Sequence, residues 1–112
     1  ACAESKTLTA ENTPNDNSHT LVVNNDTLTI TSNDKRGQNV TLSSDGFIKG
    51  RNNKTKHYFS FGVDKNYPET FTILPKSGYT FQGWYYKNEK ITSLSLPWTW
   101  KCTEIEAKFI KN

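Results

Sequence analysis

The chain contains, at residues 78–85, the run Gly78-Tyr79-Thr80-Phe81-Gln82-Gly83-Trp84-Tyr85, which decides the fold. In an extended strand successive side chains point to opposite faces, so this run presents one aromatic face. Gly83 inside the strand indicates a β-bulge or a close backbone approach. Either would change the direction in which the Trp84 side chain points. Gly78 follows a turn, where a positive φ is expected. The run therefore predicts a packed β-strand and carries no catalytic motif.

Strand-like segments continue toward the N-terminus in two expected hairpins. In the first, Leu21-Val22-Val23 and Leu28-Thr29-Ile30 flank Asn24-Asn25-Asp26, whose residues tolerate left-handed turn conformations. In the second, Val40-Thr41-Leu42 and Phe47-Ile48-Lys49 flank Ser43-Ser44-Asp45-Gly46, in which Asp-Gly is a strong turn signal.

Further strands are expected at residues 58–61, 71–74 and 104–110, and the last alternates apolar and charged residues almost ideally. No window has the apolar spacing of an amphipathic helix, and at most a short helical turn is allowed at Tyr67-Pro68-Glu69-Thr70. We predict an all-β fold, a small antiparallel sandwich or barrel-like sheet. Residues 1–19 are expected to be a polar arm or linker and residues 20–112 a single β domain, with hairpins over 20–57.

Residues 58–112 resemble the B-repeat modules of bacterial internalin-type surface proteins. The resemblance rests on residues 78–85, on the preceding Pro75, and on Thr103-Glu104-Ile105-Glu106-Ala107-Lys108-Phe109. It implies a small module related to the β-grasp shape in this half of the chain. It also implies a role in binding or spacing at a bacterial cell surface, with no active site.

Composition narrows the class of protein further. The chain has 112 residues, 33% of them hydrophobic, and a net charge of +3, so one thin aromatic core in a single domain is expected. The mild basicity does not call for nucleic acid, and no apolar run is long enough for a membrane span. We expect the chain to be a mature form, without its targeting segment.

The two cysteines, Cys2 and Cys102, lie at opposite ends of the chain. Their spacing excludes a four-cysteine zinc site and a CxxC redox motif. Two alternatives remain. The first is a Cys2–Cys102 disulfide in an oxidising compartment. The second is a lipid anchor on Cys2, tethering the protein to a membrane. Either places the protein outside the cytoplasm, in an extracellular, cell-surface or periplasmic location.

No catalytic, metal-binding or cofactor-binding motif is apparent. The histidines, His19 and His57, are not placed to serve a nucleophile, and two separated histidines make no zinc site. Glu104 and Glu106 share a strand face, but a solvated stripe opposite Ile105 is the favoured interpretation over a glycosidase pair. We therefore expect a protein that is not an enzyme and needs no cofactor.

Surplus aromatic residues indicate a binding surface instead. We expect the ligand-binding residues to be Tyr86, Trp98 and Trp100, with Lys87, Lys90 and Lys101 as a cationic rim. The alternative is that Trp98 and Trp100 only cover the open end of the sheet, continuing the face of Leu94 and Leu96 in a segment that Pro97 keeps at a sheet edge.

A second cluster consists of the basic residues Lys49, Arg51, Lys54, Lys56 and His57. A solvated turn is the favoured interpretation, and a polyanion patch is the alternative.

The function expected from the sequence is a secreted or cell-surface, non-catalytic binding or adhesion domain. Its partner would be a protein or glycan on a cell surface, recognised through the aromatic and basic residues above. A carbohydrate-binding lectin and an extracellular or periplasmic inhibitor or immunity protein are the alternatives. Salt would weaken binding to a cationic rim but hardly affect stacking on sugar.

Overall fold

The computed structural model describes residues 18–32, 38–63, 68–97 and 101–112, and within them the fold is all-β. One short 3-10 turn, η2 (Arg51–Asn53), is the only helical segment in these ranges. The strands are β1 (Ser18–Asn24), β2 (Thr27–Ser32), β3 (Gln38–Lys49), β4 (Thr55–Val63), β5 (Glu69–Leu74), β6 (Tyr79–Tyr86), β7 (Glu89–Lys90), β8 (Ser93–Pro97) and β9 (Thr103–Lys111).

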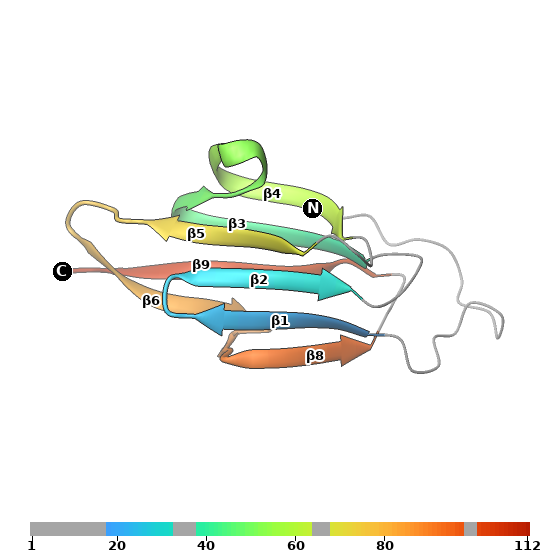
Figure 1. Ribbon diagram of the computed structural model, residues 1–112. Helices are drawn as coiled ribbons and strands as arrows, with labels where there is room; N and C mark the ends of the chain where they lie inside the picture. The colour runs from blue at the N-terminus through green and yellow to red at the C-terminus, as the bar shows by residue number, and fades with distance from the viewer. Residues whose placement is uncertain (1–17, 33–37, 64–67, 98–100) are drawn as a thin grey trace, which may run out of the picture.

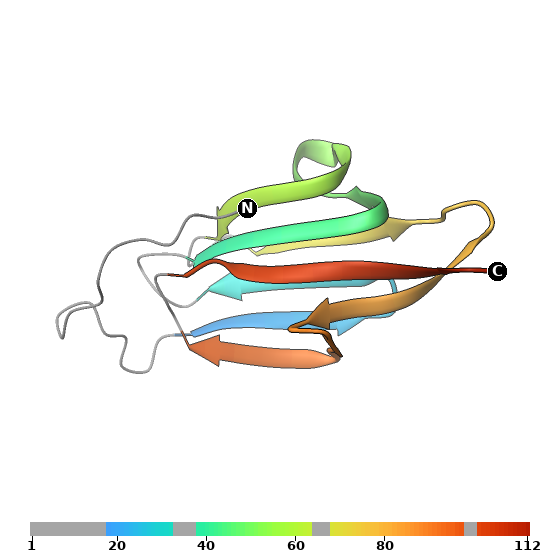
Figure 2. The ribbon, with the colours of Figure 1, turned by 180° about the vertical axis from the view of Figure 1, so that it is seen from behind.

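All nine strands form one curled sheet in the order β7-β6-β9-β3-β5-β2-β1-β8, with β4 paired to β3. Only β3 and β9 run parallel, and the other pairs are antiparallel. The sheet folds over so that β5, β2, β1 and β8 form one layer, in front of β6, β9, β3 and β4 (Figure 1), and the view from behind agrees (Figure 2). The predicted barrel-like all-β class is thus confirmed, but the prediction of a fully antiparallel sheet is wrong, because the β3–β9 pair makes the sheet mixed.

The two ends of the strand order are joined by the chain itself. Strands β7 and β8 are separated only by Ile91 and Thr92, yet β7 pairs with β6 and β8 pairs with β1. The Ile91 amide donates to the Trp84 carbonyl, and the Val23 amide donates to the Thr92 carbonyl, both at 2.9 Å. The Ile91-Thr92 connection therefore links the layer that contains β6 to the layer that contains β1.

The first predicted hairpin is confirmed. Val23 pairs with Leu28 and Asn24 with Thr27, so Asn25 and Asp26 form a two-residue turn. Asn25 has a φ of 55°, the left-handed conformation that asparagine tolerates.

The second predicted hairpin is wrong, because residues 38–49 form the single strand β3. Its register with β4 shifts between the pairs Ser43–Tyr58 and Ile48–Lys56, so β3 carries extra residues there. The Asp-Gly signal therefore belongs to a bulge. Gly46 is needed because the Phe109 ring occupies the position of its absent side chain: a Cβ would lie 2.4 Å from Phe109 Cε1.

The bulge predicted in residues 78–85 is confirmed. The register of β6 with β9 shifts between Phe81 and Gly83, and Gly83 has a φ of 140°. Trp84 is then turned fully into the core, so it adds nothing to the aromatic surface. Gly78 also has the positive φ expected of it, 79°.

The core lies between the two layers. It consists of Leu21, Leu28, Ile30, Val40, Leu42, Ile48, Phe59, Phe61, Val63, Phe71, Ile73, Trp84, Ile91, Ile105, Ala107 and Phe109. The predicted alternation of the last strand is confirmed, because Ile105, Ala107 and Phe109 are buried there.

Two further expectations bear on the edges of the sheet. Strand β8 lies at an edge of the sheet, as predicted, and Leu94 and Leu96 pack against the core. The helical turn allowed at residues 67–70 is wrong for Glu69 and Thr70, which pair with β2 as the start of β5.

Candidate functional site

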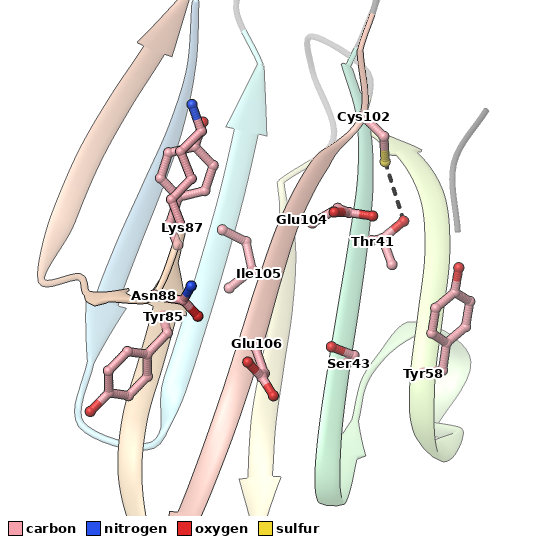
Figure 3. A pocket seen from close by; sticks show the side chains of 11 residues that line it. Thr41, Ser43, Tyr58, Tyr85, Lys87, Asn88, Cys102, Glu104, Ile105 and Glu106 are labelled. Carbon is pink, nitrogen blue, oxygen red and sulfur yellow. Dashed lines mark hydrogen bonds between the residues drawn. The ribbon is translucent and has the colours of Figure 1, made fainter. Parts of the chain in front are cut away.

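An open groove of about 400 Å³ lies on the outer face of the layer formed by β6, β9, β3 and β4. Tyr85 stands on one side of it and Tyr58 on the other, with Glu106 and Ser43 between them (Figure 3). Its floor is the sheet itself, so the residues are positioned by strand register. We call this feature the tyrosine groove.

The register aligns four side chains in one row across the sheet. Tyr85 pairs with Glu106, Glu106 with Ser43, and Ser43 with Tyr58. Three strand spacings separate the two tyrosines, which corresponds to about 14 Å. A ligand must therefore be extended to reach both rings.

A second row supplies further polar groups. Glu104 pairs with Thr41, which pairs with Ser60. The Thr41 hydroxyl lies 3.2 Å from the Cys102 sulfur in a hydrogen bond (Figure 3). The groove floor thus combines hydroxyl groups with two carboxylates.

Lysines approach two of the tyrosine rings. Lys108 Nζ lies 4.6 Å from the centre of the Tyr85 ring, and Lys87 Nζ lies 5.3 Å from that of Tyr86. Lys108 also lies 3.8 Å from a carboxylate oxygen of Glu106. Because these two ammonium groups accompany the carboxylates of Glu104 and Glu106, the charges around the tyrosine groove are balanced.

A second hollow, of about 450 Å³, adjoins η2 and the start of β4. Arg51, Lys54 and Lys56 line it, and we call it the basic hollow. Arg51 is paired with Glu69 at 3.2 Å and lies over the Phe61 ring. Tyr58, which is 41% exposed, lines both the basic hollow and the tyrosine groove.

The residues predicted for the ligand site are only partly brought together. Tyr86 and Lys87 line the tyrosine groove, and Tyr86 also packs against the core. Lys90 lies elsewhere, with its side chain over Gly83, and exposed Lys101 lines neither hollow. Trp98 and Trp100 lie outside the described residues.

The residues of the predicted basic cluster are also only partly brought together, and they extend beyond the turn into the two flanking strands. Lys49 belongs to β3, and Lys56 and His57 belong to β4. The His57 ring stacks on Phe47 at 4.3 Å, and its Nδ1 is bonded to the Gly46 carbonyl. Neither Lys49 nor His57 lines the basic hollow.

Sequence reasoning missed Tyr58, Thr41 and Ser43 as groove residues. They sit on β4 and β3, about 45 to 65 residues before Glu104 and Glu106. Only the parallel pairing of β3 with β9 brings these segments together. The polar residue at every second position of β3 was the available signal, and it indicates only an exposed strand face.

His19 is buried between the layers, where its Nε2 and the Thr103 hydroxyl form a hydrogen bond of 3.0 Å. Burial lowers the pKa of its imidazole from 6.5 to about 4. Its Nδ1 has no partner among the described residues. This histidine belongs to the interior and does not reach the tyrosine groove.

Comparison with protein-family models, with curated proteins and with solved structures gave no match for this chain. Among the residues the structure describes, no helix has the length and apolar character needed to cross a membrane. No group of three or more histidine, cysteine or acidic side chains in the same ranges is arranged to hold a metal ion.

Proposed function

We propose that this protein is a non-catalytic binding domain that is secreted or displayed on a cell surface and recognises a macromolecular partner through the tyrosine groove. The observation that carries the proposal is the row Tyr85–Glu106–Ser43–Tyr58, which four strands hold in register. Exposed tyrosines concentrate binding energy because they bury much area while losing little side-chain entropy.

The rigidity of the groove supports this proposal. Its side chains project from paired strands, so little conformational entropy is lost when a ligand binds. The location outside the cytoplasm rests on the cysteine pair and on the resemblance to B-repeat modules. The Cys2–Cys102 disulfide stays a prediction, since Cys2 lies outside the described residues.

A glycan is the partner that the groove chemistry favours over a protein. Tyrosine rings stack on the apolar faces of sugars, and the carboxylates of the floor and the Ser43 hydroxyl can accept hydrogen bonds from sugar hydroxyls. The balanced charge around the groove also differs from the cationic rim expected from the sequence. Contacts confined to this neutral area should depend little on salt.

An array of purified glycans and extracellular-matrix proteins would test the proposal. We expect the fluorescently labelled protein to bind at least one class, and the double variant Tyr58→Ala/Tyr85→Ala to lose about tenfold or more in affinity for it. Val22→Ala, at an exposed position of β1 in the other layer, is the control and should bind as the original chain does. Equal binding by the tyrosine variant would contradict the proposal.

A further inference from the structure

We propose that the tyrosine groove and the basic hollow form one continuous site for an anionic polysaccharide whose acidic sugars are separated by neutral ones. This rests on the proposed function and names its ligand class. The structural basis is Tyr58, which lines both hollows. A chain lying across β6, β9, β3 and β4 therefore passes over this ring into the basic hollow.

The two hollows share a strand as well as a side chain. Lys56, Tyr58 and Ser60 all belong to β4 and all line the basic hollow, on either side of the register shift between β3 and β4. Tyr58 and Ser60 continue the two polar rows of the groove, through Ser43 and Thr41. Lys56 pairs with Ile48 beyond the register shift, and its Nζ lies 5.5 Å from the centre of the Phe59 ring, so it reaches the hollow from the outer edge of β4.

The basic hollow is preorganised by its turn. Asn52 and Asn53 both have a φ of 58°, and the Gly50 amide donates to the Lys54 carbonyl at 2.9 Å. Arg51 is held by Glu69 and by the Phe61 ring. Backbone geometry thus places three cationic side chains around one hollow before any ligand arrives.

Charge differs sharply between the two ends of this surface. In the described part of the chain, neither Lys54 nor Lys56 has a carboxylate within ion-pair distance. The tyrosine groove, in contrast, presents Glu104 and Glu106, with Lys108 3.8 Å from Glu106 and Lys87 also lining the groove. The surface therefore favours a ligand with an anionic group at the basic hollow and uncharged, hydroxyl-rich units over the groove.

The same charges argue against other polyanions. A nucleic acid carries one negative charge on every unit, so some phosphates would lie over Glu104 and Glu106. A uniformly sulfated polysaccharide meets the same repulsion. An acidic peptide offers few hydroxyls to the carboxylates of the floor. A polysaccharide that alternates carboxylated and neutral sugars places fewer charges over Glu104 and Glu106 than a nucleic acid or a uniformly sulfated polysaccharide and still carries a carboxylate to the basic hollow.

Titration calorimetry of the full chain with three saccharides of equal length tests this inference. The probes are a hyaluronan octasaccharide, which alternates carboxylated and neutral sugars, a neutral chitin octasaccharide, and a heparin octasaccharide. We expect hyaluronan to bind tightest. Lys54→Gln/Lys56→Gln should weaken it by about tenfold at low salt and reduce its salt dependence, while leaving chitin binding unchanged.

The control variant is Lys90→Gln/Lys111→Gln, which makes the same charge change outside both hollows and should have little effect. The inference is overturned if hyaluronan binds no tighter than chitin, or if both lysine variants act alike. It is also overturned if heparin binds tightest without needing Tyr85, which would indicate a simple polyanion patch. Chitin binding that still depends on Tyr58 and Tyr85 would leave the proposed function intact. If the original chain bound none of the glycans or proteins tested, both this inference and the proposed function would be contradicted.

Discussion

His19 is the residue whose environment departs most from that of a free side chain. Its imidazole is 1% exposed and crosses from β1 to Thr103 on β9, so it joins the two layers of the sheet. Burial favours the neutral ring because a charged imidazolium would lose its hydration, and the pKa falls to about 4. Its Nδ1 is buried without a hydrogen-bond partner among the described residues, which carries a further desolvation cost.

We expect the free energy of unfolding to fall as the pH is lowered from 6.5 to 4. The unfolded chain binds a proton at His19 near pH 6.5 but the folded chain only near pH 4, so the unfolded state gains protons first. The stabilising contribution is complete above pH 6.5, and roughly 3 kcal/mol is lost by pH 4. Urea denaturation at pH 7.5, 5.5 and 4 measures it.

The matched variants are His19→Gln and His57→Gln. Removing His19 should flatten the pH dependence relative to the original chain, whatever its effect at neutral pH. His57→Gln, at an exposed position of β4, is the control for the loss of an imidazole at the surface. An unchanged slope in His19→Gln would show that other groups carry the acid sensitivity.

At the scale of elements, β3 shows how packing overrides a local turn signal. Asp45 and Gly46 favour a hairpin by themselves, yet the chain continues as one strand through a bulge. The strand continues because β4 and β5 pair with its second half and the Phe109 ring packs against Gly46. Bulges also bend a strand, and this one lies where β3 leaves β9 and joins β5.

Gly46→Ala should therefore destabilise the protein by about 1–3 kcal/mol, because its methyl group would overlap the Phe109 ring. Gly62→Ala in β4 is the control, since its Cβ would meet only Asn39 Oδ1 at 3.6 Å. That change should be neutral or slightly stabilising. Thermal and urea unfolding measure both.

Combining Gly46→Ala with Phe109→Leu should cost less than the sum of the two single changes, because the smaller side chain relieves the overlap. Additive costs would mean that Gly46 matters for backbone conformation and not for ring packing.

At the scale of the whole molecule, β3 belongs to both layers and makes them one unit. Its residues 40–44 pair with β9 in one layer, and residues 47–49 pair with β5 in the other. Residues 20–57 are therefore not an independent pair of hairpins beside a C-terminal module. A fragment consisting of residues 58–112 alone would lose β3, the parallel partner of β9.

The predicted Cys2–Cys102 disulfide is tested by the intact mass of the protein from its native host, before and after reduction. We expect a rise of about two daltons on reduction, as two hydrogens are added when the S–S bond breaks. Closing a loop of about 100 residues stabilises a fold by up to about 4.7 kcal/mol in the chain-entropy model, so reduction should also lower the melting temperature. A lipid-modified N-terminus, or labelling of both thiols in the native protein, would contradict the disulfide.

Local sequence was sufficient for most of the strands and for the bulge at Gly83. Two of these signals are local: the alternation in residues 104–110 and the turn-forming asparagines after Val23. They can therefore be recognised without knowing the partner strands. The same local information failed at Asp45-Gly46, where the contacts that decide the conformation come from Phe109, some 60 residues away.

The sequence by itself determined an all-β chain, an aromatic core and a polar stripe on the last strand. Only the tertiary structure decided that β3 lies parallel to β9, and hence that Tyr58 and Ser43 share a surface with Glu106 and Tyr85. The physical reason is that strand formation depends on side chains two positions apart. A binding surface across four strands depends on non-local pairing, whose register is set by burial of the opposite face.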